Sequence, residues 1–195
     1  MPPLAVPCVT PAEYLDAERE ADYKSEYIDG RVYPRPRASR VHNLIVGNTA
    51  SELRAQLRGR PCEVYVTDMR VKVERTGMYT YPDVVGLCEE PRFEDENADT
   101  LLNPSVIIEV LSPSTERYDR GEKFAHYRRL ESLQEYVLIT QDVWRIDHYR
   151  RDGDSWVLTE VSAPDASLVL PSLSCTLALN DIYDRVELPP AMATR

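Results

Sequence analysis

Apolar residues recur along the chain with two different periods, and the change of period separates predicted helices from predicted strands. Residues 39–58 carry apolar side chains on one helical face, between a serine cap and a glycine stop: Val41, Leu44, Ile45, Leu53 and Leu57. Residues 10–19 start with Thr10-Pro11 and have acids in the first turn, which predicts a second helix. Helical spacing of Phe124, Tyr127 and Leu130 predicts a third helix over 118–130.

The remaining apolar segments are short and β-branched, which indicates strands. The candidates are CEVYVTD with MRVKVE, then YPDVVGLC, SVIIEVL and EYVLIT. YKSEYIDGRVYP predicts a hairpin turning at Asp29-Gly30, and WRIDHYRR with SWVLTEV predicts one turning at Asp152-Gly153. LVL (168–170) and DIYDRV (181–186) close the chain. We therefore expect one α/β (α+β) domain over 1–188, with helix, three strands, helix and strand in that order, and a disordered tail at 189–195.

Composition narrows the class of protein. The 195 residues are 43% hydrophobic and 29% charged, as in ordinary soluble domains. No apolar run approaches the roughly 18 residues that span a bilayer, and no basic segment of a signal peptide opens the chain. The four cysteines show no CxxC spacing, so we expect reduced, mostly buried thiols in a cytoplasmic protein and no zinc site.

Charge is distributed unevenly. The net charge of −10 argues against nonspecific coating of nucleic acid. Yet residues 31–60 hold seven arginines against one acid, whereas residues 89–100 hold six acids against one arginine. Solvated surfaces explain either segment taken alone. The arginine-rich segment is also the natural surface for phosphate contacts, and Arg35, Arg37 and Arg40 are the candidates.

Two carboxylates are out of place in apolar strands. Glu109 interrupts SVIIEVL, and Asp83 opens DVVGLC directly after a proline. If these strands are antiparallel neighbours, pairing 88 with 104 places Asp83 opposite Glu109. Like charges so close cannot both stay ionised without a cation between them. Mg²⁺, with Mn²⁺ as a substitute, is the expected ion because it takes oxygen ligands from one or two carboxylates, water and phosphate.

A carboxylate-held Mg²⁺ would activate water and polarise a phosphoryl oxygen, and a nearby cationic side chain usually completes such a site. Lys123 is the candidate. It precedes Phe124 and lies four residues before Tyr127, so it borders the buried face of the predicted helix. The alternative is a surface lysine on an amphipathic helix.

The chain has a PD pair followed, after 25 residues, by EVL, and this motif within this order of elements resembles the PD-(D/E)XK nuclease superfamily. The resemblance implies a restriction-endonuclease-like α-β-β-β-α-β core with a mixed sheet. The N- and C-terminal β-hairpins would be additions to that core. Across residues 12 to 185 the chain resembles the Uma-two family of bacterial endonucleases. The segments that carry this resemblance are EYIDGRVY, SRVHN, VTDMRVKV, YPDVV, NPSVIIEVLSPST and YDRGEKFAHYRRL.

The resemblance implies that Asp83 and Glu109 are metal ligands, with the backbone carbonyl of Val110 as a third. One position departs from the superfamily pattern: Leu111 stands where a lysine is expected two residues after the glutamate. Some branches supply this lysine from the next helix, and Lys123 matches that arrangement.

Several further residues are candidates for supporting roles. Glu26 could add an acid near the metal or be a surface strand residue, and His42 could contact phosphate or water or be structural. Asp68 could belong to the site or turn the chain, whereas Ser112, with Ser114, is expected to organise the turn after the catalytic strand. We expect Asp119 to cap a helix. Both tryptophans and most tyrosines are interpreted as packing residues.

The leading hypothesis is a Mg²⁺-dependent endonuclease that hydrolyses phosphodiester bonds of nucleic acid, with DNA as the expected substrate and a cytoplasmic homodimer as the expected form. The alternative is a catalytically weak or inactive nucleic-acid- or protein-binding module on the same fold, which the negative net charge and Leu111 favour. A two-carboxylate glycosidase is a third possibility. It has little support, because its cleft would need aromatic residues and the chain is only 8% aromatic with two tryptophans.

Overall fold

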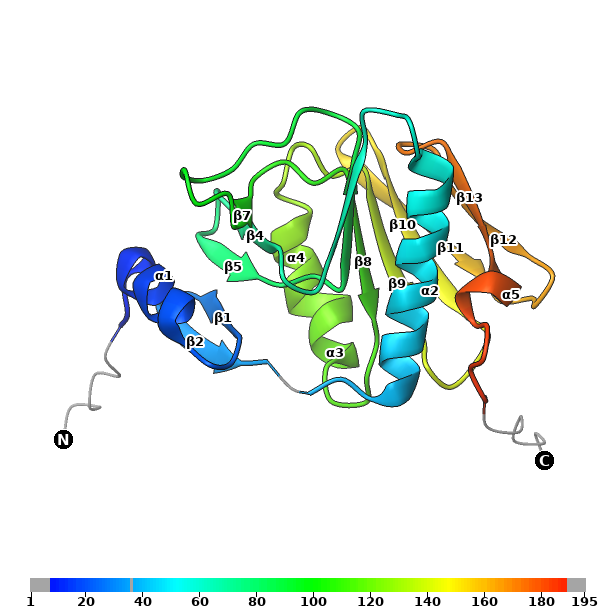
Figure 1. The fold of residues 1–195 in the computed structure, drawn as a ribbon, viewed down its shortest axis with the longest axis horizontal. Helices are drawn as coiled ribbons and strands as arrows, with labels where there is room; N and C mark the ends of the chain where they lie inside the picture. Colours follow the sequence, from blue (N-terminus) through cyan, green and yellow to red (C-terminus); the bar gives the residue numbers. More distant parts are fainter. Residues whose placement is uncertain (1–7, 36, 189–195) are drawn as a thin grey trace.

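The structure, a computed structural model, describes residues 8–35 and 37–188, so the tail predicted at 189–195 lies outside the described residues. The larger sheet has six strands in the order β11-β10-β9-β8-β6-β3 (Figure 1). These strands are Glu63–Val66 (β3), Val84–Leu87 (β6), Val106–Val110 (β8), Glu135–Ile139 (β9), Ile146–Asp152 (β10) and Ser155–Val161 (β11).

A smaller, five-stranded sheet lies beside it in the order β2-β1-β5-β4-β7. Its strands are Ser25–Ile28 (β1), Arg31–Pro34 (β2), Arg70–Val73 (β4), Met78–Thr80 (β5) and Thr100–Leu101 (β7). A separate hairpin joins Ser167–Leu170 (β12) to Cys175–Ala178 (β13). The predicted N-terminal hairpin is confirmed, because β1 and β2 turn through Asp29 and Gly30, both at positive φ.

The helical segments are Pro11–Glu20 (α1), Arg40–Leu57 (α2), Glu116–Tyr118 (α3), the π-helical Asp119–Lys123 (η1), Phe124–Tyr127 (α4) and Leu179–Ile182 (α5). Both long helices start where capping chemistry predicts. Thr10 and Glu13 form a reciprocal capping box on α1. The Ser39 hydroxyl accepts the main-chain N–H of His42 on α2.

The predicted α-β-β-β-α-β core is confirmed as α2, β3, β6, β8, the α3–α4 segment and β9. The sheet is mixed, since β8 pairs antiparallel with β6 and parallel with β9. One strand was assigned wrongly. MRVKVE does not continue β3 but forms β4 in the smaller sheet, because the chain turns at Thr67, which has a φ of +48°.

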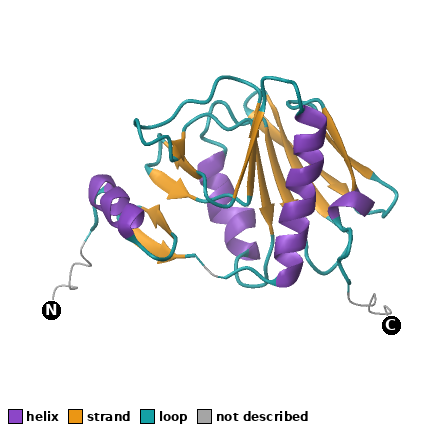
Figure 2. Ribbon diagram, viewed as in Figure 1, coloured by secondary structure: helices purple, strands orange, loops and turns teal. Residues whose placement is uncertain are grey.

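Both faces of the larger sheet are covered (Figure 2). On one face, α2 and the β12–β13 hairpin pack on the side of β8 that carries Ile108. On the other face, α4 and the smaller sheet pack on the side that carries Ile107. All five residues of β8 are therefore buried, which explains its nearly continuous apolar sequence and makes Glu109 exceptional.

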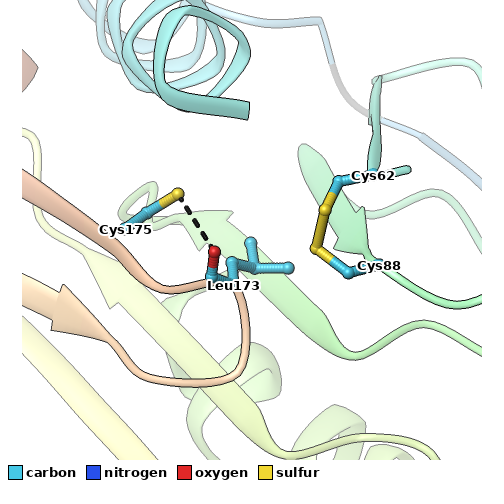
Figure 3. Close-up of a disulfide and its surroundings, with 4 residues drawn as sticks. All are labelled: Cys62, Cys88, Leu173 and Cys175. Atoms are coloured by element: carbon cyan, nitrogen blue, oxygen red, sulfur yellow. Dashed lines mark hydrogen bonds between the residues drawn. A yellow bond between two sulfur atoms is a disulfide. The ribbon is translucent and has the colours of Figure 1, made fainter. Parts of the chain in front are cut away.

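The cysteine prediction is wrong for one pair. Register places Cys62, just before β3, opposite Cys88, just after β6, and the two form a disulfide (Figure 3). Cys175 is a buried thiol whose sulfur donates to the carbonyl of Leu173, while Cys8 is an exposed thiol. Sequence spacing alone did not reveal the pair, because the two cysteines meet only once the strands align.

Two details near the C-terminus also differ from expectation. Asp152 pairs with Ser155, so the β10–β11 turn is centred on Gly153-Asp154, one residue later than predicted. The LVL segment pairs with Cys175–Ala178, and DIYDRV begins within α5 and continues as a turn. Within the described ranges, no helix has the length and apolar character needed to cross a bilayer.

Candidate functional site

Two buried acids lie side by side at one end of the larger sheet. Val84 pairs with Ile108 in antiparallel register, so Asp83, just before β6, lies opposite Glu109 in β8, as the sequence predicts. Each acid is only 3% exposed. Because an isolated buried carboxylate is strongly unfavourable, the partners of each acid determine what this site can do.

Asp83 is held by three donors from three parts of the chain. Nη2 of Arg35 lies 2.5 Å from Oδ1, and Nε2 of His42 lies 3.0 Å from Oδ2. The main-chain N–H of Val110 also donates to Oδ2, at 2.8 Å. Burial alone would raise the pKa of Asp83, but the contacts with His42, Arg35 and Val110 outweigh it and lower this pKa.

Glu109 has different partners. Nζ of Lys123 lies 2.9 Å from Oε1 of Glu109, and the Tyr127 hydroxyl donates to the same oxygen at 2.9 Å. Burial raises the pKa of Glu109 to about 8, against the opposing pull of Lys123 and with a further upward contribution from Asp83. The two neighbouring acids therefore have pKa values shifted in opposite directions.

Lys123 is the cation at the centre of this cluster. It is 5% exposed, and its Nζ lies 3.2 Å from Glu26 and 3.6 Å from Asp119 in addition to its contact with Glu109. Burial opposes its charge, yet the surrounding carboxylates, Glu109 first, hold the pKa of Lys123 well above its usual range. The lysine is thus a buried, positively charged group and not a surface residue of an amphipathic helix.

A π-helical turn positions this lysine. The helix predicted over 118–130 is interrupted at Asp119–Lys123, where the chain adopts i→i+5 geometry between α3 and α4. Such π-turns are rare and occur frequently at functional sites. Asp119 stands at the C-cap position of α3, where its main-chain N–H donates to the carbonyl of Glu116. Its side chain is buried within the turn beside Lys123, and burial raises the pKa of Asp119.

The charge of the cluster suits a divalent cation. With all four acids ionised, the cluster would carry two negative charges more than its two fixed cations neutralise: Glu26, Asp83, Glu109 and Asp119 against Arg35 and Lys123. Burial is the main cause of the raised pKa values of Glu109 and Asp119, and the neighbouring carboxylates add to both shifts. Among residues 8–35 and 37–188, no three His, Cys, Asp or Glu side chains form a preformed metal cluster. An ion here would bind two carboxylates and complete its shell with main-chain, water or substrate oxygens.

These groups line a cavity of about 760 Å³. Asp83, Glu109, Val110 and Lys123 are among the most buried residues of its lining and define its inner part, and Glu26 and His42 also line it. The role predicted for the Val110 carbonyl is untested; the contact that is present here is made by the N–H of Val110.

The other predicted residues lie farther from the acids. Asp68 is exposed at the cavity rim and pairs with Lys24. Ser112 lies in the cavity wall, where its hydroxyl bonds to Ser114 and Thr115, so it organises the turn as expected. Arg37 is exposed at the rim.

Arg40 is the first residue of α2, is exposed, and is absent from the described residues that line the cavity.

Sequence reasoning did not foresee two other features of the site. It placed Tyr127 on the buried face without a polar partner, and it assigned Arg35 to phosphate and not to Asp83. No local signal distinguishes these roles, because both contacts join elements that are distant in sequence.

Comparison with known proteins places this chain in a family. A family model described as "Uma2: Putative restriction endonuclease" matches residues 11–180. The chain belongs to this family. It is 41% identical to the uncharacterized protein sll1609 of Synechocystis sp. PCC 6803 over 161 residues, covering 82% of this chain and 91% of that one. It is 34% identical to the uncharacterized protein slr1290 of the same organism over 183 residues, covering 93% and 95%.

A solved structure shares the fold of this Uma2 protein. It is the crystal structure of a "putative nuclease belonging to DUF820" from Anabaena variabilis ATCC 29413, with a TM-score of 0.77 and 22% identity. The match covers 92% of this chain and 99% of that chain. Family and fold together support a nuclease-type function and confirm the predicted fold class.

Proposed function

We propose that the protein is a metal-dependent endonuclease that hydrolyses phosphodiester bonds, with DNA as its substrate. One observation carries the proposal: Asp83 and Glu109 stand opposite each other inside a cavity, with Lys123 Nζ 2.9 Å from Glu109. Paired carboxylates with an adjacent ammonium are suited to phosphoryl chemistry, in which positioning and charge stabilisation do most of the work.

Asp83 and Glu109 would hold the ion, and Mg²⁺ or Mn²⁺ would supply an activated water and polarise a phosphoryl oxygen. The chain's own groups do the rest. Lys123, kept charged by Glu26 and Glu109, stabilises negative charge that develops on the phosphate. The oxygen of water bonds to phosphorus and its released proton passes to solvent, the ester P–O bond breaks, and the departing oxygen takes up a proton from solvent.

Arg35 and His42 control Asp83 before an ion binds. Both contact its carboxylate directly, so an incoming cation must share or displace their contacts. Because Arg35 and His42 already contact both carboxylate oxygens of Asp83, the structure also favours a second candidate function, a nucleic-acid-binding module of the same fold without catalysis. The two functions differ in whether added metal produces cleavage.

The test is metal-dependent nicking of supercoiled plasmid and of labelled single-stranded and duplex oligonucleotides, by purified protein with Mg²⁺ or Mn²⁺. Wild type should cleave, and Asp83→Ala and Glu109→Ala should each lower the rate by about 100-fold or more. Glu160→Ala is the control, because Glu160 is exposed on β11. Circular dichroism checks folding of each variant.

Absence of cleavage by wild type with either metal would refute the catalytic proposal and leave the binding module. Cleavage that persists in both alanine variants would show that the activity belongs to other residues or to a contaminant.

A further inference from the structure

The cavity has an inner part and a mouth of different character. Its inner groups are almost inaccessible, with Asp83 and Glu109 3% exposed and Lys123 5% exposed. Its volume of about 760 Å³ falls in the range of pockets that enclose drug-sized ligands, roughly 300–1,000 Å³. A phosphate must therefore enter the protein to reach these groups.

A closed duplex presents its phosphates on the outside of a stiff rod, with a persistence length of about 50 nm. It can present a phosphate to a recessed group only where the surrounding cleft admits the whole rod. A single strand can bend and thread one nucleotide into a cavity of this size. The burial of the site thus favours a strand that is not base-paired at the point of entry.

The mouth carries two aromatic residues that the core does not use. Tyr23 is 68% exposed and Tyr33 is 45% exposed, and both line the cavity. They differ from the tyrosines that fill the core, such as Tyr14, Tyr79 and Tyr136, which are about 1% exposed or less. Exposed tyrosines beside a nucleic-acid site are suited to stacking on unpaired bases, whose faces are hidden in a duplex.

Cationic residues accompany the tyrosines. Arg37 is exposed and lines the same cavity, four residues after Tyr33; Arg35, between them, also lines it but pairs with Asp83. They lie in the segment 31–60, in which arginines exceed acids by seven to one although the whole chain is acidic. Tyr33 lies on β2, the outer strand of the smaller sheet, where all four residues are exposed. Positive charge and aromatic faces at one mouth are the combination used by single-strand-binding grooves.

We infer that the substrate of this site is a single-stranded or splayed nucleic-acid segment, with Tyr23 and Tyr33 stacking on its bases. This inference rests on the proposed function for its catalytic consequence, but the binding it describes does not depend on cleavage. The site would accordingly act on single strands, ends and unpaired junctions in preference to intact duplex.

The experiment measures fluorescence anisotropy of a labelled 20-nucleotide DNA single strand and of the same sequence as a duplex, in EDTA at one fixed salt concentration. Full-length wild type should bind the single strand at least 10-fold more tightly than the duplex. The double variant Tyr23→Ala/Tyr33→Ala should bind the single strand roughly 10- to 100-fold more weakly, as expected for lost base stacking, with duplex binding unchanged.

Two matched variants separate stacking from general damage. Tyr23→Phe/Tyr33→Phe keeps both rings and should retain single-strand affinity within about 2-fold. Leu158→Ala removes a side chain that is 51% exposed on β11, away from the cavity, and should leave affinity unchanged.

Equal or tighter binding of duplex by wild type would overturn the inference, as would unchanged single-strand affinity in the double alanine variant. If light scattering finds wild type as a dimer and the double alanine variant as a monomer, with equal single-strand affinity, the exposed β2 surface would be assigned to self-association instead. Single-strand binding without metal-dependent cleavage would support the inference and refute the proposed catalysis. Metal-dependent cleavage of duplex, without tighter binding of the single strand, would support the proposed catalysis and refute the inference.

Discussion

Replacing Glu109 with glutamine should make the folded protein more stable at neutral pH, although the change removes a proposed catalytic group. The folded structure holds Glu109 where burial raises its pKa to about 8, whereas an unfolded glutamate has a pKa of about 4.3. Between these values the folded chain retains a proton that the unfolded chain releases. Glutamine resembles the protonated side chain and can still accept the hydrogen bond from Tyr127.

The sign and size of the effect follow from proton linkage. Because the pKa is raised on folding, the stability associated with the protonated Glu109 is fully present below about pH 4 and is lost as the pH rises towards 8. At pH 7 the wild type is destabilised by about 3 kcal/mol relative to a permanently neutral side chain, and at pH 5 by about 1 kcal/mol. The advantage of Glu109→Gln should therefore grow with pH.

Urea unfolding followed by tryptophan fluorescence at pH 5, 6, 7 and 8, without added metal, measures this difference. Glu135→Gln is the matched control, since Glu135 is also a buried strand glutamate but its oxygens contact His148 and Ser172. It should lower stability at pH 7 by about 1–3 kcal/mol, because favourable hydrogen bonds to a charged group are lost. A Glu109→Gln protein that is less stable than wild type at pH 7, by the same amount as at pH 5, would refute the reasoning.

Two further predictions concern cation binding and the disulfide. Arg35→Gln should tighten Mn²⁺ binding by about 10-fold in calorimetry, because the guanidinium 2.5 Å from Asp83 competes with the ion. Arg37→Gln is the control and should change Mn²⁺ affinity little. Equal or weaker Mn²⁺ binding by Arg35→Gln would contradict this competition. Reduction of Cys62–Cys88, which are 26 residues apart, should lower the free energy of unfolding by about 3 kcal/mol in urea titrations. A stability that does not respond to reductant would show that the bridge does not form.

Much of the architecture was predictable because its signals are local. The caps Thr10 and Ser39 lie within three residues of the groups they satisfy, and the turn at Asp29-Gly30 depends on two adjacent residues. The pairing of Asp83 with Glu109 is not local; it was predicted by taking the two apolar strands as antiparallel neighbours, and their register in the structure agrees. Lys123 was a candidate because it borders the buried face of the predicted helix and because the resemblance implies a lysine from that helix.

The tertiary structure alone decided how these residues meet. The contact of Arg35 with Asp83 spans 48 residues, and that of Glu26 with Lys123 joins the N-terminal hairpin to a π-turn that interrupts an otherwise helical pattern. The disulfide likewise required β3 and β6 to align before Cys62 and Cys88 became neighbours. Helix caps and turns are determined by adjacent residues, but buried ion pairs and cross-links depend on how distant elements pack. Packing sets the distance between the two groups, and burial sets the strength of the electrostatic interaction between them.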